Sequence, residues 1–220
     1  MIFAKIDFIN LLPFDVFIKK NIKSSQIKQI INYKKSYPSK INTQFINRKI
    51  DCAFISSIAS INKKTLPLGI VAKDEVLSVL VLSKKQKDDY QSETSNALAK
   101  VLNINGQILI GDKALKYYYE NRNDTFKDLA SIWKNKYNLP FVFAILSYNK
   151  HEKYLKNIVI KFNKSNTKIP TYILNKYCAN TDLSQTQIKN YLSKITYTIG
   201  YKEKQSLKLF FKLLKQKRIK

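Results

Sequence analysis

The stretch Gln107-Ile-Leu-Ile-Gly-Asp112, continued by Lys113-Ala-Leu115, decides the fold together with the run Leu139-Pro-Phe-Val-Phe-Ala144. The first run predicts a buried strand that a glycine and an acidic residue interrupt, followed by a helix from Ala114. The second predicts another buried strand, because Phe and Val favour strands. Between them, one face of a predicted helix carries Leu129, Ile132 and Trp133. This order of elements makes half of an α/β lobe, and the preceding chain is expected to supply the opposing half.

Outward from this centre, the apolar pattern predicts further strands and helices. Strands are expected at residues 2–9, 27–33, 50–55 and 75–82. Helices are expected after Pro13, from Pro38 to Ile46, and at 96–102, where Ser92-Glu-Thr-Ser95 caps the start. Beyond residue 146 the pattern is helical, at 154–162, 172–178, 188–195 and 207–214. The apolar stripe of the last helix is expected to pack on the core rather than on a membrane surface.

The length and composition fit a globular protein. A chain of 220 residues with 45% hydrophobic residues can bury a sizeable core. No apolar run approaches the ~20 residues that cross a bilayer. Lys5 and Asp7 interrupt the region where a signal peptide needs an apolar core, so a cytoplasmic location is expected. Cys52 and Cys178 lie far apart, which indicates reduced thiols rather than a disulfide or metal framework.

The net charge of +25 raises the question of nucleic-acid binding. Arginine, which dominates the recognition of base edges and phosphates, occurs only at Arg48, Arg122 and Arg218. The lysines are spread through every segment, as on solvated faces. We therefore expect no specific nucleic-acid or membrane partner, although the positive field favours the capture of a small anion.

Short polar side chains follow the predicted strands, where helices begin. In open α/β sheets, ligands bind at such strand ends, and free N–H groups at helix starts favour anions. Each residue alone is an ordinary helix cap, Asp112 in particular, but four such points in one sheet predict a ligand site. The candidate residues are Asn10, Ser56, Ser57, Thr94, Ser95 and the Gly111-Asp112 pair.

Several kinds of site are excluded by what the sequence lacks. Its four glycines form neither a dinucleotide fingerprint nor a phosphate loop. The single histidine, His151, opens a polar helix and is expected at the surface. No second histidine is present for a metal site, and a catalytic triad could be built only through His151, which argues against nucleophilic hydrolysis. The sequence predicts a pocket for a small anion that needs no metal and no cofactor.

A set of motifs in order from about residue 2 to 146 resembles the menaquinone-biosynthesis chorismate dehydratase family. No single motif is specific, whereas the whole set is. The motifs are Phe8-Ile-Asn-Leu-Leu-Pro13, Asp51-Cys-Ala-Phe-Ile-Ser-Ser57, Val76-Leu-Ser-Val79, Ser92-Glu-Thr-Ser95, Ile110-Gly-Asp-Lys-Ala-Leu115, Asp128-Leu-Ala-Ser-Ile-Trp133 and Leu139-Pro-Phe-Val-Phe-Ala144. Glu75 stands where the family pattern leads us to expect glycine, and Phe8-Ile9 replaces the commoner Tyr-Leu.

The resemblance implies an α/β fold like that of type II periplasmic binding proteins, in which two lobes close on a ligand. One lobe would hold residues 1–76 and, after the chain returns, the mostly helical segment 146–220. The other would hold residues 77–145. The chain would cross between them at 76–82 and 141–146, both of which the apolar pattern already predicts as buried strands.

The resemblance also implies a reaction: the loss of water from chorismate to give 3-[(1-carboxyvinyl)oxy]benzoate in the futalosine route, by a hydro-lyase without cofactors. Ser56, Ser57, Thr94 and Ser95 would bind the two carboxylates, and Asn10 would orient the reacting ring or the departing hydroxyl. No histidine or acidic residue lies in a suitable place to act as base. We therefore hypothesise that the enolpyruvyl carboxylate of the substrate takes the proton.

Two other functions are compatible with these residues. One is a non-catalytic cytoplasmic protein of the same fold that senses a small anion. The other is the related naphthoate synthase of the same pathway, whose resemblance implies a histidine base. His151 lies outside every matched motif, so chorismate dehydration is preferred.

Overall fold

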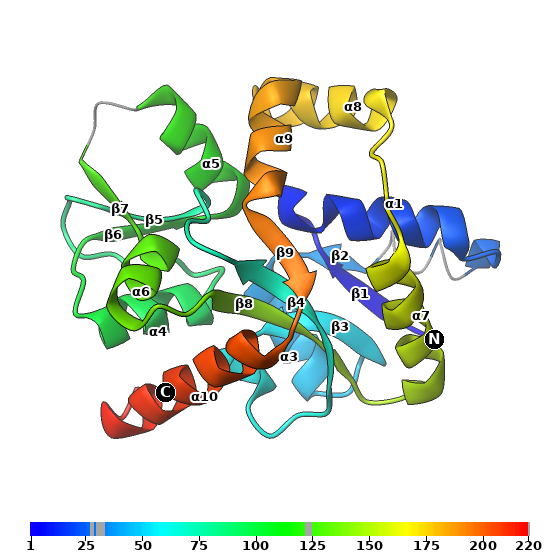
Figure 1. Cartoon of the computed structure of the whole chain (residues 1–220), viewed down its shortest axis with the longest axis horizontal. Helices are drawn as coiled ribbons and strands as arrows, with labels where there is room; N and C mark the ends of the chain where they lie inside the picture. The colour runs from blue at the N-terminus through cyan, green and yellow to red at the C-terminus, as the bar shows by residue number, and fades with distance from the viewer. Residues whose placement is uncertain (27–28, 30–33, 122–124, 220) are drawn as a thin grey trace.

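The computed structural model describes residues 1–26, 29, 34–121 and 125–219, and it contains two β-sheets with helices around them (Figure 1). The strand expected at 27–33 lies outside the described residues. The chain passes from the six-stranded to the three-stranded sheet at residues 73–78 and returns at residues 138–140. The α/β class is therefore confirmed, and the site has to be sought between the sheets.

The six-stranded sheet has the strand order β2-β1-β3-β8-β4-β9. β1 pairs in parallel with β2 and β3, whereas β8 and β9 pair antiparallel with their neighbours. β3 is buried along its whole length, as expected of a strand that is covered on both faces. The strands span Phe3–Ile6 (β1), Lys35–Ser36 (β2), Cys52–Ser56 (β3), Thr65–Ala72 (β4), Phe141–Tyr148 (β8) and Ile195–Thr198 (β9).

The three-stranded sheet has the order β6-β5-β7, and both pairings are antiparallel. Its strands span Val79–Leu82 (β5), Gln107–Ile110 (β6) and Phe126–Asp128 (β7). The strand at Gln107–Ile110 is confirmed, but the helix after it begins at Gly111, three residues earlier than expected. The strand Phe141–Tyr148 belongs to the six-stranded sheet, whereas the sequence pattern grouped it with Gln107–Ile110 in half of one lobe.

Helices cover both sheets (Figure 1). The helix predicted from Pro38 to Ile46 is confirmed, as are the four helices predicted after residue 146. The short strand β9 interrupts that helical region and was not predicted. The helices span Leu12–Asn21 (α1), Pro38–Ile46 (α3), Glu93–Leu102 (α4), Gly111–Glu120 (α5), Leu129–Tyr137 (α6), Glu152–Lys164 (α7), Thr171–Thr181 (α8), Gln185–Ser193 (α9) and Tyr201–Gln216 (α10), with 3-10 turns at Ile9–Leu11 (η1) and Ile58–Ser60 (η2).

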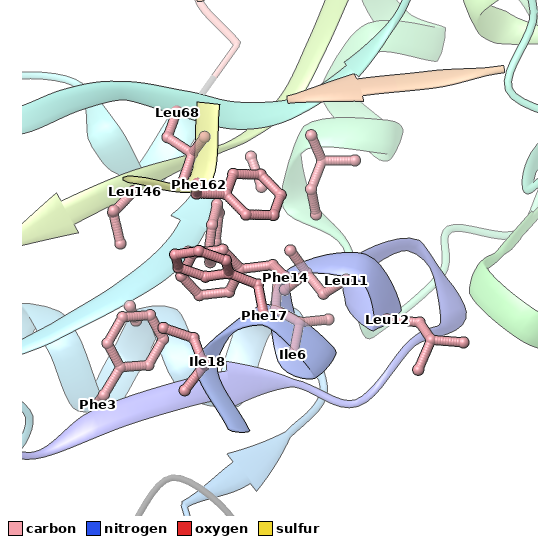
Figure 2. Packing of buried hydrophobic residues seen from close by; sticks show 14 of the residues in the cluster. Phe3, Ile6, Leu11, Leu12, Phe14, Phe17, Ile18, Leu68, Leu146 and Phe162 are labelled. Atoms are coloured by element: carbon pink, nitrogen blue, oxygen red, sulfur yellow. The ribbon is translucent and has the colours of Figure 1, made fainter. Parts of the chain in front are cut away.

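The main core lies between the six-stranded sheet, α1 and α7 (Figure 2). Phe14 and Phe17 of α1 meet Phe162 of α7 edge-on, with ring centroids 5.1 and 5.2 Å apart. Phe14 also meets Phe54 of β3 at 5.0 Å. Edge-to-face packing of this kind adds to the hydrophobic gain, so this cluster fixes α1 and with it the preceding turn η1.

A second core lies under the three-stranded sheet and is centred on Trp133, which is fully buried. Phe141 and Phe210 pack on its ring at 5.1 and 5.9 Å, and its indole N–H donates to Ser206 Oγ at 3.0 Å. The apolar stripe of α10 therefore packs on the core, as predicted, through Phe210 and Leu214. The C-terminal helix thus contacts the three-stranded side of the molecule.

The predicted strand at 75–82 is shorter than expected, because only Val79–Leu82 pairs with neighbours. Leu77 has a left-handed backbone with φ of 59°, which an extended strand cannot contain. The carboxylate of Asp128 accepts hydrogen bonds from the N–H groups of Val76 and Leu77 at 3.0 and 2.7 Å. The side chain of Asp128 thus accepts the backbone hydrogen bonds that a neighbouring strand would otherwise accept. Ser78, the next residue, lines the space between the sheets.

None of the helices in the described part of the chain is long and apolar enough to cross a membrane.

Candidate active site

A cleft opens between the two sheets, at the ends of β1, β3 and β6 and beside the crossing segment. Its empty volume, together with the solvent at its mouth, is about 480 Å³. The residues that line it come from both sides: Ile6, Phe8, Asn10, Pro38, Ser56, Ile70, Val76, Ser78, Val79, Ser92, Ser95, Ile110, Gly111, Phe143 and Ala144. The cleft therefore brings together Asn10, Ser56, Ser95 and Gly111 from the sequence prediction.

The described residues that line the cleft include no charged side chain. Its polar side chains are the hydroxyls of four serines and the amide of Asn10. Ser92 and Ser95 belong to the start of α4, where the N–H groups of Glu93 and Thr94 have no partner within the helix. Oriented dipoles in a site with few charges and little water interact strongly with an anion. The cleft is suited to a small, ring-shaped anion.

Ser56 occupies the end of β3 and is held by Asn42 of α3. The Asn42 side-chain NH2 donates to Ser56 Oγ at 2.7 Å, and the Ser56 N–H donates to Asn42 Oδ1 at 3.0 Å. The other amide proton of Asn42 reaches Glu93 Oε2 at 3.2 Å. Because Ser56 Oγ already accepts from Asn42, its own proton is free to be donated to a ligand.

Ser95 is oriented in the same way from the opposite side of the cleft. Ser92 is the N-cap of α4: its Oγ accepts from the Ser95 N–H at 3.1 Å and donates to Ser95 Oγ at 2.9 Å. Both serines are at most 7% exposed. The Ser95 hydroxyl therefore accepts from Ser92, and its own proton is free to be donated to a ligand in the cleft. In this respect Ser95 resembles Ser56.

Asn10 lies in η1 and has a buried side-chain oxygen, Oδ1, that has no partner among the described residues. The hydroxyl of Tyr197 donates to the Asn10 backbone oxygen at 2.6 Å. Tyr191 lies 2.9 Å from Ser78 Oγ, and its hydroxyl also interacts with the Asn10 side chain. Burial raises the pKa of Tyr191, against the lowering effect of these hydrogen bonds, so the phenol keeps its proton. A buried side-chain oxygen without a hydrogen-bond partner is uncommon and calls for an explanation; among the described residues, Asp15 Oδ1 is the other such oxygen.

Gly111 explains how η1 approaches the three-stranded side. Its φ is +64°, and an added Cβ would lie 2.7 Å from the ring of Phe8. Glycine is therefore required both for the backbone and for the close approach. Phe8 in turn forms part of the cleft wall.

Three of the predicted site residues do not line the cleft. Ser57 is fully buried, and its hydroxyl donates to the Val142 carbonyl at 2.5 Å. Thr94 Oγ1 accepts from the Ile58 N–H at 3.1 Å, so it caps η2. Asp112 Oδ1 accepts from the Ile9 N–H at 3.1 Å, so it caps η1 rather than its own helix α5. Thr94 and Asp112 thus join the two sides of the cleft.

Asp112 should make stability depend on pH. Burial, and secondarily Asp7, raises the pKa of its carboxyl from an ordinary 3.8 to about 6, against the Ile9 hydrogen bond. The folded protein therefore keeps this proton up to a higher pH than the unfolded chain, and stability falls as pH rises through 4–6. In Asp112→Asn, which keeps the acceptor for Ile9, we expect a gain over the wild type of about 2–3 kcal/mol above pH 7 that vanishes near pH 4.

Urea denaturation of both proteins at pH 4.5 and 7.5 checks this expectation. A difference in the free energy of unfolding that stays constant between the two pH values would contradict it.

Four residues around the cleft were not predicted as site residues: Asn42, Ser78, Ser92 and Tyr191. Ser78 was present in a quoted motif but was assigned to a strand, and Ser92 was recognised only as a cap. Asn42 interrupts the apolar face of its helix, and its 1% exposure shows that it belongs to the core. Tyr191 could not be predicted as a site residue from the sequence, because a tyrosine in a predicted helix is compatible with packing alone.

His151 lies outside the cleft. Its imidazole is 3.5 Å from Asp51, and its side chain is 44% exposed. No group of three or more His, Cys, Asp or Glu residues in the described part of the chain has the arrangement of a metal site.

The sequence comparisons agree with the family suggested by the motifs. Residues 103–216 match the sequence model of a family described as menaquinone biosynthesis. Over 219 residues the chain is 46% identical to a chorismate dehydratase of Campylobacter jejuni subsp. jejuni (serotype O:23/36, strain 81-176), and the match covers 98% of each protein.

The structural comparisons concern the fold. A protein from Archaeoglobus fulgidus superposes with a TM-score of 0.71 at 15% identity, covering 99% of this chain and 97% of the other. The periplasmic aliphatic sulphonate-binding protein of Escherichia coli superposes with a TM-score of 0.53 at 11% identity, covering 96% and 91%. The predicted likeness to periplasmic binding proteins is confirmed. With the near-complete sequence match, these findings establish that the chain belongs to the chorismate dehydratase family of menaquinone biosynthesis.

Proposed function

We propose that this protein is a chorismate dehydratase, a hydro-lyase that converts chorismate to 3-[(1-carboxyvinyl)oxy]benzoate and water without a cofactor, in the cytoplasm. The observation that carries the proposal is the buried Oδ1 of Asn10, which has no partner among the described residues and belongs to a side chain that lines the cleft together with serine hydroxyls. The 46% identity to a chorismate dehydratase supports it. Family membership supports the proposed reaction, and the positions of these residues around the cleft support their proposed roles.

The two carboxylates of chorismate would be bound from opposite sides. Ser56 donates from the end of β3, and Ser95 donates from α4 together with the first-turn N–H groups of Glu93 and Thr94. Hydrogen bonds to charged groups contribute about 1.5–3 kcal/mol each. Since none of the described residues that line the cleft carries a charged side chain, these dipoles hold the substrate and stabilise the charge that develops during reaction.

Elimination requires a proton and a hydroxide to leave adjacent ring carbons. Removal of the proton from the carbon that bears the enol ether delocalises charge through the diene into the ring carboxylate. Asn10 Oδ1 accepts a hydrogen bond from the neighbouring hydroxyl and holds its C–O bond in line for departure. The enolpyruvyl carboxylate takes the proton and passes it to the leaving hydroxide, so one water is released and the ring becomes aromatic.

A direct test is to incubate the purified protein with chorismate and to follow the benzoate product by absorbance and mass spectrometry. Binding of chorismate without product would favour a sensor. Turnover that disappears in His151→Ala would favour a histidine base and contradict the proposed mechanism. Product formation that needs neither His151 nor added metal supports the proposal.

Neighbouring serines provide a matched pair of variants. Ser56→Ala should raise KM for chorismate about tenfold, since a donor to a carboxylate is lost. Ser57→Ala loses only its bond to the Val142 carbonyl, so it should lower stability by about 1 kcal/mol and leave KM unchanged. Steady-state kinetics and urea denaturation of both variants separate binding from folding. Equal KM values would remove Ser56 from the binding site.

Tyr191→Phe tests the support of Asn10 and Ser78. The variant keeps the packing of the ring but loses the hydroxyl that both side chains contact. We expect kcat to fall about tenfold with little change in KM, because orientation rather than binding is impaired. Tyr154→Phe, at an exposed position on α7, is the control. A rise in KM alone would show that Tyr191 acts on substrate binding.

A further inference from the structure

A second, larger cavity lies behind the cleft, between α8 and the ends of β1 and β2. Its empty volume, counted with the solvent at its mouth, is about 1370 Å³. It contains four lysines and three aspartates, together with an apolar and aromatic side from α8. No role in the proposed reaction involves it. The residues that argue for a ligand are Lys5, Asp15, Lys19, Lys35, Lys176 and Tyr177.

The cavity and the cleft share a wall. Ile6 and Phe8 face the cleft, whereas Asp7 between them lines the second cavity. At the start of α5, Gly111 likewise lines the cleft and Asp112 the cavity. At residues 6–8 and at residues 111–112, a single stretch of backbone therefore separates the cleft from the second cavity.

The charges in the cavity leave one cation without a partner. Asp15 pairs with Lys5 at 2.9 Å and with Lys19 at 3.0 Å, and Asp7 pairs with Lys35 at 3.4 Å. Lys5 and Asp15 are almost fully buried, so this part of the cavity is preorganised rather than mobile. With Asp112 ionised, the four lysines and three aspartates of the lining carry a net charge of +1. Lys5 and Lys19 share the single carboxylate of Asp15, and Lys176, which is exposed, has no carboxylate partner among the described residues. One negative charge on a ligand would balance this net charge.

The side formed by α8 can hold a flat ring. Tyr172, which is 73% exposed, and Ile173 lie there beside Tyr177. Burial and the nearby carboxylates of Asp15, Asp7 and Asp112 raise the pKa of Tyr177, so its hydroxyl remains a donor. A cation and a phenol donor next to exposed aromatic surface form a site for an anion that carries a ring.

We propose that this cavity is a second ligand site for a small aromatic monocarboxylate, with the carboxylate on Lys176 and the Tyr177 hydroxyl and the ring against Tyr172 and Ile173. Binding there is independent of the proposed reaction. If the proposed function holds, the shared wall couples the two sites, because Asp112 also holds the Ile9 N–H beside Asn10.

Calorimetric titration of the full-length protein with benzoate tests the site. We expect binding that Lys176→Glu weakens at least about tenfold, whereas Lys189→Glu, at an exposed position on α9 outside the cavity, has no effect. Ser95→Ala, which alters the cleft, should leave benzoate affinity unchanged. Inorganic phosphate, which has the charge but no ring, should bind more weakly than benzoate.

Benzoate binding that Ser95→Ala abolishes, that Lys176→Glu does not weaken, or that is absent at millimolar concentration would overturn the proposal. Phosphate binding more tightly than benzoate would overturn the assignment to aromatic carboxylates. In turnover assays, benzoate should raise KM for chorismate in the wild type and less in Lys176→Glu. An unchanged KM overturns the coupling, while the titration decides the site by itself.

Discussion

Asn10→Ala should lower kcat by about 10²–10³ while KM changes little, as is typical when a preorganised polar group that acts on the transition state is removed. The side chain contributes a buried oxygen that has no hydrogen-bond partner in the part of the chain that the structure describes. Such an oxygen costs stability unless a ligand uses it, so selection for folding alone would not retain it. The variant loses the interaction with Tyr191 but also removes this unpaired oxygen, so the free energy of unfolding should change by less than about 1 kcal/mol.

Asn10→Asp is the matched control, since it keeps the shape and places a negative charge where a dicarboxylate binds. It should raise KM strongly, because none of the described residues that line the cleft has a cationic side chain to offset the repulsion between like charges. Steady-state kinetics with thermal denaturation of both variants measure these effects. If Asn10→Ala retained wild-type kcat, Asn10 would not orient the departing hydroxyl.

Helix-start residues and apolar patterns correctly predicted individual helices and strands, because these elements depend on neighbouring residues in the sequence. The start of α3 at Pro38 and the strand Gln107–Ile110 follow from proline at a first helical turn and from continuous apolar character. The shortened strand β5 could not be predicted, since Leu77 adopts a left-handed backbone and its N–H group donates to the carboxylate of Asp128, 51 residues away. The pairing of β8 with β3 and β4 likewise depends on contacts distant in sequence.

The site was predictable to the extent that its residues end strands. Asn10, Ser56 and Ser95 met this rule and line the cleft. Ser57, Thr94 and Asp112 met it equally well, but their side chains bind backbone groups. Sequence position places a hydroxyl near a strand end, and only the direction of the side chain separates a ligand donor from a cap. Asn42 and Tyr191 act from helices that the rule does not consider.

Asp128 is the residue on which the crossing segment depends. Its carboxylate is buried and accepts four backbone hydrogen bonds: Oδ1 from Ala130 and Ser131 at the start of α6, and Oδ2 from Val76 and Leu77. Burial raises the pKa of Asp128, while these four bonds lower it. The same side chain therefore caps a helix and shapes the backbone that delivers Ser78 to Tyr191.

Asp128→Ala should lower the free energy of unfolding by about 4 kcal/mol, because it removes the cap and leaves four N–H groups without their acceptor. Asp128→Asn keeps one acceptor oxygen and turns an NH2 group toward the other pair of donors, so about half of that loss is expected. In this variant kcat should also fall, since residues 76–77 are released and Ser78 moves from Tyr191. Asp74→Ala, at a 73% exposed carboxylate of the same crossing, should change stability by less than about 0.5 kcal/mol. Urea denaturation measures all three, and equal losses for Asp128→Ala and Asp74→Ala would show that the buried carboxylate does not shape the crossing.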